Sequence, residues 1–174
     1  MPDNQNKLLK HWYALYTKPK HEFKAKLQLH HLEIENYLPT IIITKKWSDR
    51  KKKVEEPVFR GYIFIYVNES ERLLALKQST IIKTICFEGK PCIVPQWQIE
   101  NLKKMLKVNP EVFISDKIEI GTKVKITEGP FSDIIGIVIE YKPGEKYLGV
   151  TIEMLHRTVL VRLPKDSSYK IIDL

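Results

Sequence analysis

The segment Tyr62–Val67 restricts the fold of this chain more than any other stretch of its sequence. Its even-numbered residues, Tyr62, Phe64 and Tyr66, are aromatic, and the residues between and after them are aliphatic. Successive side chains of a β-strand point to opposite faces of the sheet, so a strand here carries one aliphatic and one aromatic face. A small sheet has a single core. The second apolar face must therefore be covered by a helix of the same chain or by another protein.

Strand and helix signals alternate through the first 107 residues. Aromatic and β-branched runs predict strands, and apolar residues at helical spacing among good helix formers predict helices. The expected strands cover residues 11–17, 36–44, 58–67, 81–87 and 91–94, and the expected helices cover 20–34, 69–77 and a segment from near 95 to 107. Asn109-Pro110 then ends the last helix, and we expect a linker over residues 108–118.

The remainder, residues 119–174, is predicted to be almost wholly β. Residues 148, 150, 152 and 154 are apolar and share one strand face, and a hairpin tip is expected at 155–157. Five short strands joined by tight turns are typical of a small barrel. The two-residue alternation and the β-branched residues favour strands rather than helices throughout this segment.

Positive charge is concentrated in the first part of the chain. Lys and Arg outnumber Asp and Glu by 29 to 21, a formal net charge of +8. Residues 1–116 hold 20 basic and 13 acidic side chains, whereas residues 117–174 hold nine and eight. Contact with a polyanion is therefore expected in the first part. Residues 45–53 include six basic side chains without an apolar period, which predicts an exposed hairpin tip or loop.

Targeting and membrane signals are missing from the sequence. No run approaches the roughly 20 apolar residues that cross a bilayer. Residues 1–10 form a polar tail without the apolar core of a secretory signal. We therefore expect a cytoplasmic protein that has no membrane contact.

Catalytic and metal-binding patterns are missing as well. Cys86 and Cys92 are too few for a disulfide framework and lie outside the spacing of zinc knuckles, so we expect them to be core thiols. The five histidines add no metal set, and no phosphate-binding glycine loop, nucleophile elbow or carboxylate pair occurs. These patterns predict a binding protein without cofactor, metal or catalytic residues rather than an enzyme.

Three segments resemble a known family. They are residues 12–16 (WYALY), 56–65 (EPVFRGYIFI) and 121–131 (GTKVKITEGPF) followed by Gly136. In this order, across residues 11–172, they resemble the NusG family of transcription elongation factors. The segments 47–51 (WSDRK) and 91–95 (PCIVP) are similar to specialised paralogues such as RfaH and the UpxY-type antiterminators of surface-polysaccharide operons.

The resemblance implies an α+β fold with two domains. Residues 11–107 would form a NusG-type (NGN) domain, an antiparallel sheet with flanking helices. Residues 119–174 would form a KOW domain, an SH3-like five-stranded β-barrel. Arg60 stands where the family commonly has proline in the turn before Gly61.

The same resemblance implies a monomeric, non-enzymatic factor that docks on the clamp helices of the RNA polymerase β′ subunit and suppresses pausing or termination. The residues that match the docking surface are Tyr16, Tyr62, Phe64 and Phe87. The hairpin tip of the KOW domain matches the place where the family meets ribosomal protein S10 or the termination factor Rho, which indicates Met154 and Leu155.

Contact with non-template and upstream DNA is also implied by the family. Lysine and arginine neutralise phosphates regardless of sequence, whereas unpaired bases offer ring faces and edges. The matching positions are Lys18, Lys20, His21, Lys24 and His31 near the first helix, and Lys45, Lys46, Arg50, Lys51, Lys52 and Lys53 in the basic hairpin.

One alternative from another class is a ribosome-associated protein that binds RNA through its KOW domain, because that motif also occurs in ribosomal proteins. The charge distribution disfavours this alternative, since residues 117–174 carry a net charge of only +1.

Overall fold

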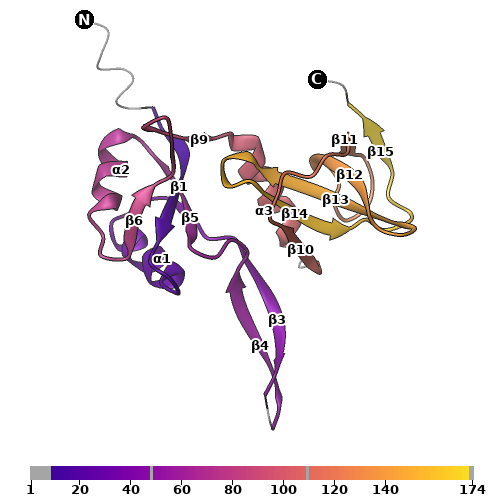
Figure 1. Cartoon of the computed structure of the whole chain (residues 1–174), viewed down its shortest axis with the longest axis horizontal. Helices are drawn as coiled ribbons and strands as arrows, with labels where there is room; N and C mark the ends of the chain where they lie inside the picture. The colour runs from indigo at the N-terminus through magenta and orange to yellow at the C-terminus, as the bar shows by residue number, and fades with distance from the viewer. Residues whose placement is uncertain (1–8, 48, 109, 173–174) are drawn as a thin grey trace, which may run out of the picture. The chain divides into compact units, whose positions relative to one another are not determined.

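The computed structural model describes residues 9–47, 49–108 and 110–172 (Figure 1). The chain divides into two compact units. Unit 1 comprises residues 1–40 and 55–96, and unit 2 comprises residues 41–54 and 97–174. Residues 1–8 of the expected polar tail lie outside the described residues.

Unit 1 is built on an antiparallel sheet with strand order β2-β5-β1-β6, and β9 also pairs with β1. A two-stranded ribbon, β3 and β4, lies between β2 and β5 in the sequence, and its residues 41–54 are assigned to unit 2. The elements of this part of the chain are β1 His11–Thr17, α1 Glu22–His31, β2 Asn36–Tyr37, β3 Thr40–Lys46, β4 Lys51–Pro57, β5 Tyr62–Val67, α2 Glu69–Leu76, β6 Ile81–Thr84, β7 Cys86–Phe87, β8 Lys90–Pro91 and β9 Ile93–Val94.

The core of unit 1 lies on the aliphatic face of β5. Tyr13 and Leu15 of β1 stand opposite Ile65 and Ile63 of β5 in the antiparallel register. All four belong to one buried cluster, which also contains Ala25 and Leu29 of α1 and Ala75 of α2. The two helices therefore cover one face of the sheet, and burial of this apolar surface drives the packing.

A buried arginine fixes α2 against the sheet. Arg72 is 7 % exposed, and its guanidinium donates to both carboxylate oxygens of Glu69 and, at 2.9 Å, to Thr84 Oγ1 of β6. A buried charge is tolerated only when it is paired and hydrogen-bonded, and these contacts supply both. A capping box at the start of α2, between Asn68 and Glu71, satisfies two further backbone N–H groups.

The C-terminal part of unit 2 contains helix α3 (Gln96–Lys107), whose first residue is still assigned to unit 1. It also contains a six-stranded antiparallel sheet with strand order β10-β14-β13-β12-β11-β15. Its core is formed by alternate residues of the central strands, among them Leu148, Val150 and Val159, each at most 1 % exposed. The elements of this sheet are β10 Val112–Ser115, β11 Thr122–Ile126, β12 Ile135–Lys142, β13 Glu145–Ile152, the 3-10 turn η1 Glu153–Leu155, β14 Arg157–Arg162 and β15 Tyr169–Ile171.

The α+β fold and the β structure of the C-terminal segment are confirmed. The sheet has six strands instead of five because β10 pairs with β14, Val112 standing opposite Val161. This strand lies inside the segment expected to be a linker, where its short apolar run gave a weak signal. The domain boundaries at 107 and 119 stay a prediction, since the compact units divide at Gln96.

Two further expectations need correction. Met154 lies in the turn η1 and not on strand β13, because the strand ends at Ile152. The cysteines are not core thiols: Cys86 is exposed and Cys92 is half-buried. Cys86 is the first residue of the small hairpin of β7 and β8, and Cys92 follows its last residue; this hairpin pairs separately from the sheet that contains β6 and β9. Among the described residues, no helix has both the length and the apolar character needed to cross a membrane.

Replacing Gly136 of β12 by alanine should destabilise unit 2. A Cβ atom at this position would lie 2.4 Å from the carbonyl oxygen of Gly149 on β13, so the two central strands would have to separate. We expect a loss of about 1–3 kcal/mol in the free energy of unfolding, the usual range for overpacking, measured by urea denaturation. The control is Lys170→Ala, at an exposed position of the edge strand β15 of the same sheet, which should change the free energy of unfolding by less than about 0.5 kcal/mol. An equal effect of the two substitutions would contradict the close approach at Gly136.

Candidate docking surface and nucleic-acid interface

The aromatic face of unit 1 is organised in cross-strand rows by the register of β1 and β5. Trp12 stands opposite Tyr66, and Tyr16 stands opposite Tyr62. The ring centroids of each pair are 5.4 Å apart. Aromatic pairs at such distances attract each other beyond their burial of surface, so the rows stiffen this face.

The middle of the aromatic face is buried within unit 1. Phe64 is 0 % exposed, and its ring lies 6.1 Å from the ring of Phe59 and 6.4 Å from that of Tyr37. Burial also raises the pKa of the Tyr37 hydroxyl. Phe64 was predicted to be a docking residue, but in this conformation its ring is not accessible to a partner.

The end of this face that carries Tyr16 and Tyr62 is more open. Both tyrosines are partly exposed. On the other side of β1, Lys83 of β6 stands opposite Tyr16 and is exposed. Because directly paired residues share a face, Tyr62, Tyr16 and Lys83 form one continuous row with a cationic end. We call this row the tyrosine row.

A buried carboxylate shapes the turn beside the tyrosine row. Glu22, in the first turn of α1, is 5 % exposed and accepts a hydrogen bond of 2.7 Å from the backbone N–H of Gly61. Gly61 has a φ of +83°, and a Cβ there would lie 3.0 Å from the ring of Tyr16. Glycine is therefore required for both its conformation and its lack of a side chain. The neighbouring Arg60 is exposed and forms an ion pair with Glu56 at 3.2 Å.

The fourth predicted docking residue, Phe87, lies on the β7–β8 hairpin. Its side chain is 70 % exposed. An aromatic ring in water is an apolar surface available to a partner. Ile93 of β9, which follows the hairpin, is 51 % exposed as well.

Positions predicted to contact nucleic acid lie around the start and along one side of α1. Lys18 and Lys20 precede the helix and are exposed, and Lys20 adopts a φ of +61°. His21 is half-buried, and its Nδ1 lies 2.8 Å from the carbonyl oxygen of Pro19. Lys24 and His31 are exposed and lie seven residues apart, which places them on the same side of the helix.

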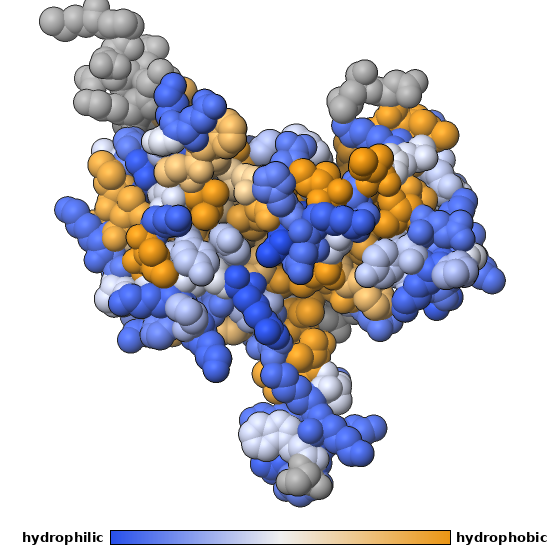
Figure 2. Space-filling model, viewed as in Figure 1, coloured by the Kyte–Doolittle hydropathy of each residue, from blue (hydrophilic) through white to orange (hydrophobic). Residues whose placement is uncertain are grey.

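The remaining predicted positions lie on the ribbon of β3 and β4. Lys45 and Lys46 belong to β3, Lys51, Lys52 and Lys53 belong to β4, and all five are exposed, as is Arg50 in the turn. In Figure 2 the far end of the ribbon, at the bottom, is coloured from hydrophilic blue to white. The expected exposed hairpin is thus a regular two-stranded ribbon. Its turn is closed by a hydrogen bond of 2.8 Å from the N–H of Trp47 to the carbonyl oxygen of Arg50.

The predicted second-partner residues lie at the tip between β13 and β14. Met154 is half-buried, and Leu155 is only 8 % exposed. Of these two side chains, Met154 is therefore the more accessible. Arg157, which follows the tip, forms an ion pair with Asp116 at 3.2 Å.

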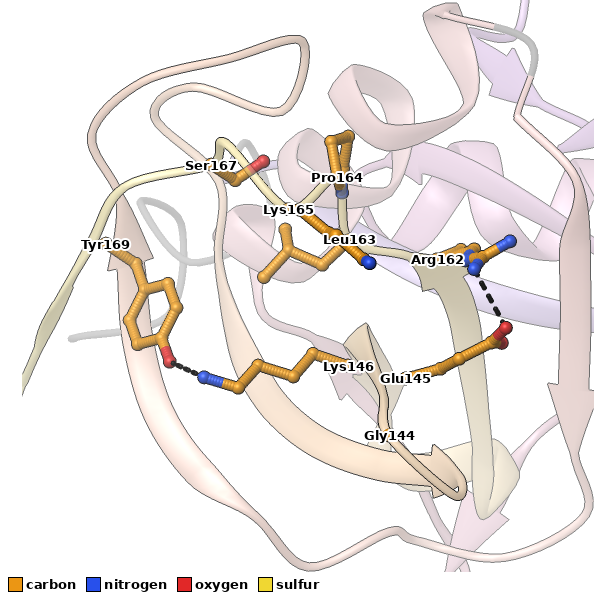
Figure 3. A pocket seen from close by; sticks show the side chains of 9 residues that line it. All are labelled: Gly144, Glu145, Lys146, Arg162, Leu163, Pro164, Lys165, Ser167 and Tyr169. Carbon is orange, nitrogen blue, oxygen red and sulfur yellow. Dashed lines mark hydrogen bonds and ion pairs between the residues drawn. The ribbon is translucent and has the colours of Figure 1, made fainter.

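A separate cavity of about 310 Å³ lies in the C-terminal sheet, between the start of β13 and the loop after β14 (Figure 3). Lys146 donates to the hydroxyl of Tyr169 at 2.9 Å, which raises the pKa of Lys146. Arg162 forms an ion pair with Glu145 at 2.8 Å. In the described part of the chain, no group of three or more His, Cys, Asp or Glu residues could hold a metal ion.

The protein class follows from these observations together with comparisons to known proteins. A sequence model of the family described as "Transcription termination factor nusG" matches residues 10–103. The chain thus has an α+β unit with an aromatic sheet face, a basic ribbon and a C-terminal β-sheet, within a sequence that matches this family over more than half of its length. It belongs to the NusG family, which confirms the resemblance.

Two individual relatives agree with this assignment, and one solved structure is reported beside them. A "Transcription termination/antitermination protein NusG" from Campylobacter jejuni is 27 % identical over 92 % of this chain and 97 % of its own length. The protein of the same name from Pasteurella multocida is 25 % identical over 82 % of this chain and 86 % of its own length. The solved structure described as "Domain interaction in Thermotoga maritima NusG" is 20 % identical, covers 88 % of this chain and 93 % of that chain, and gives a TM-score of 0.47.

Sequence analysis did not identify two residues of the candidate surfaces as binding residues. Lys83 is one of 29 basic residues, and only the pairing of β6 with β1 places it beside Tyr16. Trp47 lies within the basic segment, for which the family resemblance implied DNA contact through the basic side chains only. A large aromatic residue between runs of lysine was the signal that could have identified it.

Glu22→Ala should destabilise unit 1, because it leaves the buried N–H of Gly61 without an acceptor. We expect a loss of about 1–3 kcal/mol in the free energy of unfolding, measured by urea denaturation. Glu22→Gln should lose less, since an amide oxygen can still accept the bond. The control is Glu55→Ala, which removes an exposed hydrogen bond with Thr40 and should cost under about 0.5 kcal/mol. Equal losses for the two alanine variants would contradict this role of Glu22.

Proposed function

We propose that this protein is a non-enzymatic transcription elongation factor that docks on the clamp helices of the RNA polymerase β′ subunit through the tyrosine row and Phe87. One observation carries the proposal: a NusG-family sheet whose two covering helices lie on one face and whose other face keeps a partly exposed tyrosine pair at its end. Aromatic side chains are enriched at the centre of protein interfaces, and a charged side chain such as Lys83 is typical of the polar rim.

The mechanism is binding energy and not bond chemistry. A factor that binds one conformation of polymerase more tightly shifts the enzyme toward that conformation by no more than the difference in affinity. A factor that prefers the closed clamp would therefore suppress pausing and termination. Such a factor needs no cofactor and acts as a monomer in the cytoplasm, where bacterial RNA polymerase works.

The basic positions support a second contact, with non-template and upstream DNA. The exposed lysines before α1 and those of the ribbon can neutralise phosphates without reading sequence. Few phosphates are within reach, so binding to free DNA should be weak and sensitive to salt. The main role of this contact is to orient a factor that is already held by polymerase.

The proposal extends to the subtype and to a partner of the C-terminal sheet. The segments 47–51 and 91–95 support a specialised paralogue of the RfaH or UpxY type that serves surface-polysaccharide operons. The tip at Met154 and Leu155 is the proposed contact with ribosomal protein S10 or Rho. Because Leu155 is buried, Met154 would make most of that contact.

The double variant Tyr16→Ala/Tyr62→Ala tests the docking surface. We expect its affinity for RNA polymerase to fall at least tenfold, since the loss of two interface aromatics commonly exceeds about 1.4 kcal/mol. The measurement is titration of labelled full-length protein with polymerase. The control is Tyr141→Ala in unit 2, whose side chain is 44 % exposed and which should bind as the unchanged protein does.

An unchanged affinity in the folded double variant would overturn the docking model. Phe64→Ala is not a suitable test, because removing a fully buried phenylalanine costs about 3–5 kcal/mol of stability by itself. Tight binding of the full-length protein to ribosomal RNA, without binding to polymerase, would favour the ribosome-associated alternative.

Charge removal on the ribbon tests the DNA contact. We expect Lys51→Gln/Lys52→Gln/Lys53→Gln to weaken binding to duplex DNA and to reduce the slope of log affinity against log salt by about 0.9 for each phosphate that is no longer neutralised. Fluorescence anisotropy across a salt series measures both quantities. The control triple variant, Lys142→Gln/Lys165→Gln/Lys170→Gln, changes exposed lysines of the C-terminal segment, outside the ribbon, and should leave the slope unchanged. Equal slopes for both triple variants would refute the assignment of the contact to the ribbon.

A further inference from the structure

We propose that Trp47, at the turn of the ribbon, stacks on an unpaired base, so that the ribbon prefers nucleic acid with exposed bases to an intact duplex. This inference rests on the proposed contact between the ribbon and nucleic acid. Neutralisation of phosphates needs only the lysines and Arg50 of the ribbon. The inference assigns a binding partner to Trp47, which has no role in that phosphate contact.

Exposure of the Trp47 ring is the first observation. The side chain is 52 % exposed, whereas Trp12 in the sheet of unit 1 is 5 % exposed. Its backbone N–H is bound to the carbonyl of Arg50, which fixes Trp47 at the first position of the turn. A large ring at the end of a two-stranded ribbon gains little from the protein core, so its apolar surface is available to a partner.

Charge around the ring is the second observation. Residues 41–54 contain six basic residues and one acidic residue, a net charge of +5 in fourteen positions. The acidic residue, Asp49, lies 4.0 Å from Arg50, and both side chains are largely exposed. Such a concentration of positive charge attracts a polyanion and disfavours a basic or neutral protein partner.

The ring and the charges together indicate the kind of polyanion. Proteins that bind single strands combine cationic side chains, which follow the backbone, with aromatic rings on which bases stack. Lys52 Nζ lies over the Trp47 ring, 5.7 Å from its centroid. A base would therefore stack on the opposite face of the ring, with the Lys52 ammonium close enough to contact a neighbouring phosphate. Within an intact duplex the base faces are already stacked on one another, and only phosphates and groove edges remain for the ribbon.

Trp97 offers a matched control within the same chain. Its side chain is 44 % exposed, and Lys123 Nζ lies 5.8 Å from the centroid of its ring. The ring of Trp97 borders a groove in unit 2 that is also lined by Ile118, Ile135 and Val150. Trp97 thus resembles Trp47 in exposure and in its lysine partner, but it lies in apolar surroundings instead of a basic ribbon.

The experiment measures binding of the full-length protein to four fluorescein-labelled probes by anisotropy at low salt. The probes are a DNA single strand of about 12 nucleotides, within the usual site size, the same strand with abasic positions at its centre, the matching duplex, and an RNA strand of the same sequence. The variants are Trp47→Ala, Trp47→Phe and Trp97→Ala. Urea denaturation confirms that each variant is folded.

We expect Trp47→Ala to weaken binding to the DNA single strand about tenfold, while its binding to the duplex and to the abasic strand changes less than about twofold. Trp47→Phe should retain most of the affinity, because phenylalanine keeps a ring face, and Trp97→Ala should bind all four probes as the unchanged protein does. The slope of log affinity against log salt should not change in Trp47→Ala, since every phosphate contact is kept. If Trp47→Ala loses as much affinity for the RNA strand as for the DNA strand, the ring contacts unpaired bases of either kind. A smaller loss of affinity for RNA assigns the contact to DNA.

If Trp47→Ala loses affinity equally for duplex and single strand, or loses none for either, the inference is overturned. Either result would show that the Trp47 ring makes no contact with an unpaired base. Salt-sensitive binding of the unchanged protein would then still support the phosphate contact. If the unchanged protein shows no salt-sensitive binding to any probe, the proposed nucleic-acid contact fails and this inference fails with it.

Discussion

The pairing of β1 with β5 is the constraint on which the rest of unit 1 depends. Its register places Leu15 opposite Ile63 on one face and Tyr16 opposite Tyr62 on the other. Because side chains alternate strictly along both strands, the aliphatic face cannot be formed without forming the aromatic face at the same time. The helices α1 and α2 cover the aliphatic face, so the aromatic face is the one left for other contacts.

Exposure differs between the middle of that second face and its end at Tyr16 and Tyr62, and this difference supports a binding role. The middle is closed by Phe59, Tyr37 and the fully buried Phe64, which makes it a rigid support. The end at Tyr16 and Tyr62 is open and is held in position by the hydrogen bond between Glu22 and Gly61. A stiff platform with a small accessible aromatic area loses little conformational entropy when it binds a partner.

Charge and aromatic surface act over different distances in this protein. The net charge of the ribbon attracts a polyanion from afar and weakens with salt, whereas a stacked ring acts only at contact and is insensitive to salt. The ribbon combines both properties at Trp47 and Lys52. With the proposed contacts, the protein would approach nucleic acid without selectivity and would still distinguish strands with exposed bases from intact duplex.

The sequence by itself determined the α+β class, the face on which each residue of β5 lies and membership of the NusG family, because alternation and local motifs are properties of neighbouring residues. Only the tertiary structure decided that Phe64 is buried while Tyr62 is partly exposed, that Lys83 stands beside Tyr16, and that β10 adds a sixth strand to the C-terminal sheet. These outcomes depend on side chains and strands that are distant in the sequence. A period of two residues fixes the face of a side chain, but its exposure is set by whatever the fold brings over that face.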